Sequence, residues 1–295
     1  IKKDGFESIA EFYMLIEGEN PTTMAKSTGV GLMELPTIFE RIDPDIVLTV
    51  GDRFETMSTT LAAAYMNLPI AHTMGGEVSG TIDESIRHAV TKFSHIHFPA
   101  SQEAAERIIK LGEREQDVHL VGCPRIDLIK DIIDNKSGEL LKSLSDGVGG
   151  EVDIQKPFVI VSQHPVTTEF GEGERQIIET LKAIHRYDIP AIVLWPNADA
   201  GSEDISKGIR KWRESGLDKK MHFYKNLPVD HYVTLMRKTL CLIGNSSSGI
   251  REGAFLGTPV INIGSRQDMR ERGSNVIDVG HNENEIFSAI GDQIN

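Results

Sequence analysis

The chain has few cysteines, no long apolar run and no signal-peptide pattern, and each absence excludes a class of protein. Its 295 residues include two cysteines, Cys123 and Cys241, each in an apolar context typical of strands, so no disulfide framework is expected. No stretch approaches the roughly 18 apolar residues of a membrane span. We therefore expect a cytoplasmic protein without a membrane partner.

Basic residues are also in the minority. Lysine and arginine number 31 against 44 aspartates and glutamates, which gives a net charge of -13. Nucleic acids need a basic field on their binding protein, so this balance argues against a nucleic-acid partner. A small anionic ligand stays compatible with it, because a few local cations and backbone amides can hold one.

The common cofactor and metal motifs are missing as well. The sequence contains no GxGxxG, no GxxxxGK, and neither a CxxC nor an HExxH pattern. The residues therefore give no indication of a dinucleotide cofactor or of a metal site.

What the chain does have is a regular alternation of short apolar segments with amphipathic ones. Segments such as 46–50 and 69–72 predict strands, each followed by a helix on a short connection, which is typical of parallel sheets. The polar, glycine-rich stretch 136–156 interrupts this alternation, which then restarts. We predict an α/β protein with two Rossmann-like domains, residues 1–125 and 126–295.

In open parallel sheets, ligands bind beyond the carboxyl ends of the strands, and the first half has polar residues there. Asp52 and Arg53 follow the strand 46–50, although a helix cap with a local ion pair also explains them. After the strand 69–72, Gly75-Gly76 would allow backbone to approach a ligand closely. Helix capping accounts for Asp83 but leaves two further polar residues of this stretch unexplained, Glu77 and His88.

The second half has its own polar residues after strands. His164 follows the strand 158–162 and precedes a proline, a position suited to acid-base work or to donation to a phosphate, or to a purely structural hydrogen bond. The loop from Asn197 through Gly201 and Ser202 follows the strand 191–195.

A run of small hydroxyl residues follows the predicted strand 240–243. Ser246, Ser247 and Ser248 stand between Asn245 and Gly249 at the start of a predicted helix that contains Glu252. Serine is a common helix cap, but three in succession exceed what a cap needs, and we interpret them as a phosphate-binding loop. Arg266, after the strand 259–263, adds a cation for the same nucleotide.

With GDRFE, GGEVSGTIDESIRHAVTK, QHPVTT, NADAGS, GNSSSGIRE and GTPVINIGSRQ in this order, the chain resembles the hydrolysing UDP-N-acetylglucosamine 2-epimerases of sialic-acid and related nonulosonate synthesis. The resemblance runs over essentially the whole chain. It implies a GT-B-like pair of Rossmann domains with the active site between them. It further implies that the products are N-acetylmannosamine and UDP, that the reaction needs no redox cofactor or metal, and that the protein is a homodimer or homotetramer. It also implies that the first strand of the N-terminal domain is missing and that the last helix is truncated.

The resemblance assigns roles to individual residues. Asp52, Asp83 and His164 fall on catalytic positions, with Arg53 beside the first. Ser246, Ser247 and Glu252 fall on the diphosphate and ribose positions of the family, and Arg266 falls on a nucleotide-contacting arginine. Asn197 lies in the matching sugar-nucleotide loop, together with Gly201 and Ser202.

One departure from the family pattern leaves the substrate open. Relatives that read H-I-E-G-G have an acid where this chain has Met74, so either Glu77 supplies the catalytic carboxylate or the substrate differs. A UDP- or GDP-linked 2,4-diacetamido-trideoxy sugar of legionaminic-acid synthesis is the alternative substrate. A GT-B glycosyltransferase and an inactive sugar-nucleotide binder are alternatives of other classes.

Overall fold

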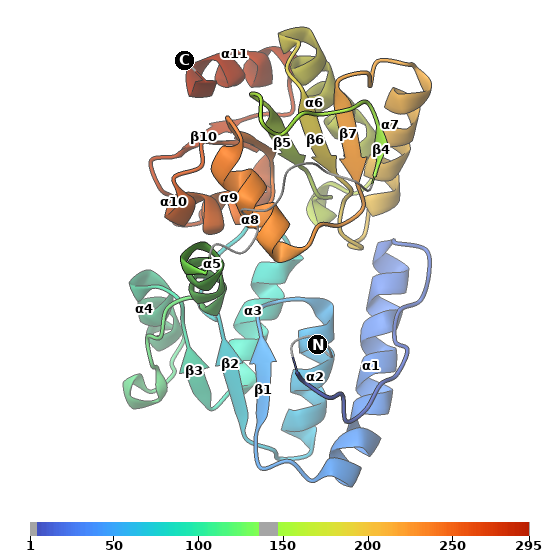
Figure 1. Cartoon of the computed structure of the whole chain (residues 1–295). Coiled ribbons are helices and arrows are strands. Elements are labelled where there is room, and N and C mark those ends of the chain that lie inside the picture. The colour runs from blue at the N-terminus through green and yellow to red at the C-terminus, as the bar shows by residue number, and fades with distance from the viewer. Residues whose placement is uncertain (1–4, 136–146, 295) are drawn as a thin grey trace. The chain divides into compact units, whose positions relative to one another are not determined.

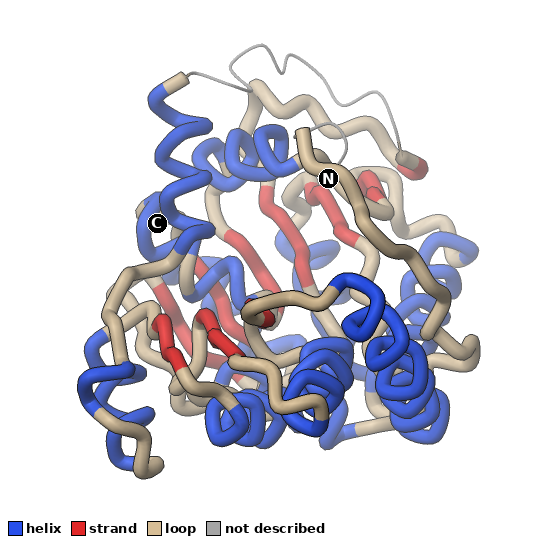
Figure 2. Tube along the Cα trace, turned by 90° about the horizontal axis from the view of Figure 1, so that it is seen from below, coloured by secondary structure: helices blue, strands red, loops and turns tan. Residues whose placement is uncertain are grey.

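The computed structural model describes residues 5–135 and 147–294, and the chain divides into two compact units. The first comprises residues 1–77 and 82–123, and the second comprises residues 78–81 and 124–295. Strands and helices alternate in both, as can be followed in Figures 1 and 2. Of the polar stretch predicted as a boundary, residues 136–146 lie outside the described part.

The first unit is built on a parallel sheet in the order β1-β2-β3. Its strands and helices are α1 (Pro21–Ile42), β1 (Val47–Val50), α2 (Phe54–Tyr65), β2 (Ile70–Thr73), α3 (Ile82–Phe93), β3 (Ile96–Phe98) and α4 (Gln102–Lys110). Val47, Ala63 and Ile70 form its small apolar cluster. Helix α1 begins where Asn20 and Thr23 form a capping box, in which each side chain accepts a hydrogen bond from the other's backbone amide.

The second unit has a sheet in the order β10-β9-β8-β5-β6-β7-β4, parallel except for the edge strand β4. Its strands are β4 (Val148–Gly149), β5 (Val159–Ser162), β6 (Ala191–Leu194), β7 (Met221–Tyr224), β8 (Leu242–Gly244), β9 (Val260–Ile263) and β10 (Val276–Val279). Its helices are α5 (Pro124–Asp134), α6 (Gly173–Tyr187), α7 (Ser202–Glu214), α8 (Val229–Lys238), α9 (Ser247–Ile250), α10 (Glu252–Leu256) and α11 (Glu283–Ile294).

Helices cover both faces of this second sheet, because apolar side chains of successive strand residues point to opposite faces. On β5, Val159 and Val161 belong to the apolar cluster that includes residues of α6, α7 and α11. Ile160, between them, belongs to the cluster on the other face, with residues of α8. Figure 1 shows these two groups of helices on opposite sides of the strands. The central strands of the sheet are therefore covered on both faces, while the edge strand β4 is exposed.

The chain reverses direction across this sheet at β5. From β5 it continues to β6 and β7 on one side, and β8, the next strand, returns to pair with β5 on the other side. The loops after β5 and β8 therefore start side by side and diverge, which opens a crevice at the carboxyl ends of the strands. Gly244, at the end of β8, has φ +137°, and a Cβ there would lie 2.2 Å from the Ser162 carbonyl oxygen.

Residues 78–81 pack within the second unit although they stand between β2 and α3 in the sequence. The Gly80 amide donates to the Arg266 carbonyl (3.1 Å), and Arg270 Nε donates to the Val78 carbonyl (3.2 Å). A Cβ on Gly80 would lie 1.9 Å from the Ser265 carbonyl oxygen, so this contact requires glycine.

Three local expectations differ from the structure. The apolar segment 118–121 predicts a strand from its sequence, but in the structure it forms one bridge between Val118 and His97, because the segment runs past the short β3 at the sheet edge. Helix α5 was not expected from the sequence, and the predicted helix at 249–255 is two short helices that meet at Arg251. Within the described residues, no helix is both long and apolar enough to cross a membrane.

Candidate functional site

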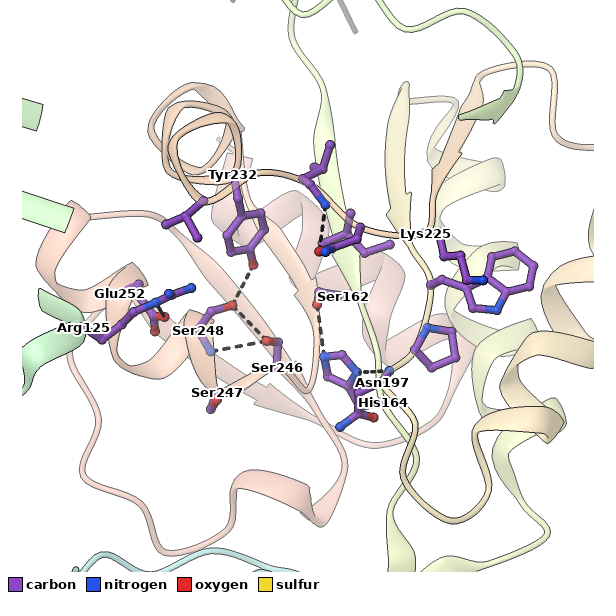
Figure 3. A pocket seen from close by; sticks show the side chains of 16 residues that line it. Arg125, Ser162, His164, Asn197, Lys225, Tyr232, Ser246, Ser247, Ser248 and Glu252 are labelled. Atoms are coloured by element: carbon purple, nitrogen blue, oxygen red, sulfur yellow. Dashed lines mark hydrogen bonds and ion pairs between the residues drawn. The ribbon is translucent and has the colours of Figure 1, made fainter. Parts of the chain in front are cut away.

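A cavity of about 480 Å³ opens at the point where the second sheet reverses direction (Figure 3). That volume is in the range of sites for small ligands and cofactors. Polar side chains at the ends of strands, in the loops after them or on adjoining helices line it: Arg125, Ser162, His164, Asn197, Lys225, Tyr232, Ser246, Ser247, Ser248 and Glu252. Five of the residues predicted for nucleotide binding or catalysis therefore meet at one place: His164, Asn197, Ser246, Ser247 and Glu252.

His164 is held on both sides of its main chain by one buried side chain. Its amide donates to Asn245 Oδ1 (2.7 Å), and Asn245 Nδ2 donates to its carbonyl (2.9 Å). The Asn245 side chain is fully buried, so these bonds are protected from water. The loop after β5 is thus fixed to the loop after β8.

The imidazole of His164 is oriented by a further backbone group. The Asn197 amide lies 3.1 Å from His164 Nδ1 and donates to it, so a neutral ring carries its proton on Nε2. Nε2 lies 3.4 Å from Ser162 Oγ, at the wall of the cavity. Figure 3 shows the ring between Ser162 and Asn197. A neutral His164 can therefore donate a hydrogen bond from Nε2.

Three hydroxyl groups form a chain along the opposite wall of the cavity (Figure 3). Tyr232 Oη lies 2.7 Å from Ser248 Oγ, which lies 2.9 Å from Ser246 Oγ. Burial raises the pKa of the Tyr232 phenol to about 12, so it stays protonated and can donate. Since α9 has four residues, hydroxyl and amide donors contribute more to anion binding here than a helix dipole does.

Two cations and one carboxylate complete the lining. Arg125, near the start of α5, donates from Nε to Glu252 Oε1 (3.2 Å), and the Glu252 side chain is buried. Lys225, after β7, is exposed at the cavity. The combination of donors and cations suits an anionic ligand, while Glu252 can accept hydrogen bonds from neutral hydroxyl groups.

Asn197 lines the cavity and has one acceptor that is not satisfied within the described part of the chain. Its Nδ2 donates to Asp199, whereas its Oδ1 is buried and has no hydrogen-bond partner in the described part of the chain. Buried polar atoms in native structures are nearly always satisfied, so this oxygen points to a ligand with a donor group.

The other predicted nucleotide residues of this unit lie outside the cavity lining. Gly201, with φ +95°, precedes α7, and Ser202 is its first residue and is buried. Arg266 donates from Nη1 to the Asn245 carbonyl (3.1 Å), so it supports the loop after β8 from behind.

The predicted residues of the first unit are connected through Arg87. The Arg87 side chain is fully buried, pairs with Asp52 through Nη2 and donates from Nη1 to the Glu77 carbonyl (2.7 Å). A buried guanidinium needs such partners because its desolvation is costly. Arg87 therefore fixes the loop after β1 against the loop after β2.

His72, on β2, supports the same turn. Its Nε2 lies 2.8 Å from the Gly51 carbonyl and donates to it, while Thr91 Oγ1 lies 3.3 Å from Nδ1. Burial lowers the pKa of His72 to about 4, so the ring is neutral at physiological pH and Thr91 donates to its Nδ1. The position of Asp52 is thus fixed from its own side chain and from the preceding residue.

The two glycines of the first unit have a structural explanation. A Cβ on Gly75 would lie 2.9 Å from His72 Nδ1, and a Cβ on Gly76 would lie 2.2 Å from the Ala104 carbonyl oxygen. Gly76 also has φ +78°. Close packing of the protein's own atoms therefore accounts for these glycines, without the approach of backbone to a ligand that the sequence suggested.

The remaining predicted residues of the first unit lie on helices or immediately before one. Asp83 is in the first turn of α3, and Arg53, at the start of α2, forms an ion pair with Glu55 (3.3 Å). His88 lies 3.8 Å from Glu84, one helical turn before it.

Sequence reasoning missed several residues of the site. Tyr232, Lys225 and Arg125 line the cavity, and Asn245 holds His164. Asn245 precedes the serine run and could have been found from that position. Tyr232 gave no signal, because a tyrosine on an amphipathic helix is usually a core residue.

The chain is similar to known proteins of one family. A family model described as UDP-N-acetylglucosamine 2-epimerase matches residues 2–295. The UDP-N,N'-diacetylbacillosamine 2-epimerase (hydrolyzing) of Legionella pneumophila is 32% identical over 100% of this chain and 76% of its own length. The UDP-N-acetylglucosamine 2-epimerase of Neisseria meningitidis is 29% identical over 98% of this chain and 73% of its own.

A solved structure shares the fold. The UDP-N-acetylglucosamine 2-epimerase of Methanocaldococcus jannaschii, in complex with UDP-GlcNAc and UDP, superposes with a TM-score of 0.77 at 18% identity, over 92% of this chain and 75% of that one. The fold is therefore GT-B-like, with Rossmann-like parallel-sheet units, as predicted. Because the family model spans nearly the whole sequence, the chain belongs to the UDP-N-acetylglucosamine 2-epimerase family.

Proposed function

We propose that the protein is a hydrolysing 2-epimerase that converts UDP-N-acetylglucosamine and water into N-acetylmannosamine and UDP. The observation that carries the proposal is the cavity of the second unit, where a donor on His164 Nε2 lies among serine hydroxyls and a lysine. Such a set suits a diphosphate. Relatives and a solved neighbour whose names include this substrate support the choice.

The reaction requires two kinds of group. A base removes the proton from C2 while the C1–O bond breaks and UDP leaves, which gives a glycal. Water then adds at C1, and a proton returns to C2 on the opposite face. The first step needs a base near C2 and stabilisation of charge on the leaving diphosphate.

The second unit supplies the groups for the diphosphate. His164 donates from Nε2, and the hydroxyls of Ser246 and Ser247 donate further hydrogen bonds to the diphosphate. The Lys225 ammonium neutralises part of the developing charge. Glu252 accepts hydrogen bonds from the ribose hydroxyls, and Asn197 Oδ1 accepts one from the sugar.

The first unit contains three carboxylates among the residues predicted to be catalytic. Asp52, Glu77 and Asp83 are the candidate acid and base groups in this proposal. The buried ion pair with Arg87 gives Asp52 a fixed direction, and general acid-base groups need such orientation.

A second substrate has support of its own. The Legionella relative named for a diacetylated UDP-sugar is 32% identical over the full chain, and a Campylobacter jejuni relative named for the GDP- or UDP-linked form is 31% identical over 92% of it. A 2,4-diacetamido-trideoxy sugar nucleotide is therefore the second candidate, with the same chemistry at C1 and C2.

Product analysis by NMR separates these possibilities. The protein is incubated in D₂O with the UDP- and GDP-linked forms of both sugars. We expect free nucleoside diphosphate, a C2-inverted sugar and deuterium at C2. Release of UDP only in the presence of an acceptor would indicate a glycosyltransferase, and no product from any of the four would indicate a binding protein. Product without deuterium at C2 would contradict elimination and readdition.

Two substitutions test the assignment of roles. Asp52→Asn and His164→Ala are expected to lower turnover by roughly 100- to 10,000-fold. Asp45→Asn and His185→Ala are matched controls, because both residues are exposed, and their rates are expected to equal that of the wild type. Near-normal turnover in folded Asp52→Asn and His164→Ala proteins would remove these assignments.

A further inference from the structure

One buried amide connects the two loops that form the diphosphate end of the cavity. The Asn245 side chain donates to and accepts from the main chain of His164, at 2.9 and 2.7 Å. Its own amide donates to the Ser162 carbonyl (3.1 Å). Its carbonyl accepts from Arg266 Nη1 (3.1 Å) and from Gln267 Nε2 (2.8 Å). Every polar group of Asn245 is therefore engaged, and its next neighbour in the chain is Ser246.

The hydrogen bonds between Asn245 and His164 lie outside the pairing of β5 with β8, so they are not needed to form the sheet. Strands β5 and β8 pair through residues 160–162 and 242–244, and both loops have left the sheet where the Asn245 side chain reaches His164. Loops at strand ends are mobile unless they are bound to something. The Asn245 side-chain amide therefore fixes the distance between His164 and the loop with Ser246, beyond the last hydrogen bond between β5 and β8.

We propose that Asn245 is a positioning residue for the diphosphate. It holds His164 Nε2 and the Ser246 loop at the spacing that a bound diphosphate bridges. Arg266 helps to hold Asn245 in place, since its guanidinium donates to the Asn245 carbonyl. The inference rests on the proposed function, because the diphosphate is part of that proposal.

The alternative role for Asn245 is general stability, and the neighbouring strand offers a matched control. Asn262, on β9, pairs in register with Gly244, and its side chain is buried. It donates to Asp278 on β10 (2.7 Å). Removal of either amide costs the fold a buried hydrogen bond, but only Asn245 contacts His164.

Calorimetry with UDP and with uridine measures the effect. In Asn245→Ala we expect the affinity for UDP to fall about tenfold, the effect of two lost hydrogen bonds. The affinity for uridine, which lacks the diphosphate, is expected to stay within about twofold. Asn245→Asp keeps the acceptor for the His164 amide and is expected to lose part of the UDP affinity. This variant replaces Asn245→Ala in the experiment if the alanine variant does not fold. Asn262→Ala is expected to leave the ratio of the two affinities unchanged.

The ring nitrogen shifts of His164, recorded by NMR without nucleotide, give a readout that does not depend on the reaction. The wild type is expected to show the Nε2–H tautomer, and the Asn245 variants a mixture of both tautomers. Equal weakening of UDP and uridine binding with an unchanged tautomer would overturn the inference while leaving the proposed function standing. A tautomer mixture in the Asn245 variants, together with a wild type that binds no UDP, would retain the effect of Asn245 on His164 and reject the diphosphate site.

Discussion

Acidification is expected to destabilise the first unit through His72. Burial lowers the pKa of the folded His72 imidazole to about 4, from an ordinary value of 6.5, and the hydrogen bond to the Gly51 carbonyl only partly opposes this effect. The ring is therefore neutral in the folded unit at pH values where it is charged in the unfolded chain. In that window the unfolded state binds more protons, so stability falls as the pH is lowered.

The size of the effect follows from the two pKa values. A shift of this size is worth on the order of 3 kcal/mol once the pH has fallen below both values. Between pH 7 and pH 5 the loss is roughly 2 kcal/mol, because the folded ring is still almost entirely neutral at pH 5. His72→Gln should remove this contribution, since an amide can still donate to the Gly51 carbonyl but does not titrate in this range.

Hydrogen exchange read by mass spectrometry is the suitable assay. The two tryptophans, Trp195 and Trp212, both lie in the second unit, so their fluorescence does not report on the first. Peptides from α2, β2 and α3 report the opening free energy of the first unit, and peptides from the second unit serve as an internal reference.

The control is His119→Gln, which removes an exposed imidazole from the same unit. It is expected to keep the wild-type loss of stability between pH 7 and pH 5, whereas His72→Gln is expected to reduce that loss by roughly 2 kcal/mol. The same loss in His72→Gln as in the wild type would refute the reasoning, because another group would then carry the pH dependence.

Three further predictions concern the second unit. Gly244→Ala places a Cβ 2.2 Å from the Ser162 carbonyl oxygen at φ +137°, and we expect a loss of about 1–3 kcal/mol in urea unfolding followed by tryptophan fluorescence; unchanged stability would contradict the close contact. Tyr232→Phe removes a hydroxyl that shares a hydrogen bond with a serine of α9, and calorimetry should show UDP affinity lowered about fivefold. Burial raises the pKa of the Cys241 thiol to about 12, so iodoacetamide at pH 8 should label the half-buried Cys123 and leave Cys241 intact until the unit unfolds, as mass spectrometry can check.

The chemistry of single loops could be predicted from the sequence. The periodicity of apolar residues predicted the alternation of strands and helices. Each polar or charged residue just after a predicted strand then became a candidate for the functional site. His164, Ser246 and Glu252 were found in this way, and they meet in one cavity. Such signals are local, because a histidine before a proline or a run of serines is visible without any knowledge of its neighbours.

Reasoning from residue types failed where a residue's meaning depends on a distant partner. Arg87 lies on an amphipathic helix, where an arginine usually stays at the surface, yet its guanidinium is buried against Asp52, which lies 35 positions earlier. Gly76 suggested an approach to a ligand, yet it makes room for the Ala104 carbonyl. Tyr232 resembled an ordinary core residue until α8 placed its hydroxyl beside Ser248.

The sequence by itself determined the α/β class, the family and most of the chemical groups on the cavity wall, because periodicity and short motifs are written into consecutive residues. Only the tertiary structure decided that β8 returns beside β5 and so brings Asn245 to His164, 81 positions away. Periodicity shows which face of a strand is buried, but every order of these strands buries the same faces. The order that forms the cavity is fixed by the packing of the whole sheet and its helices.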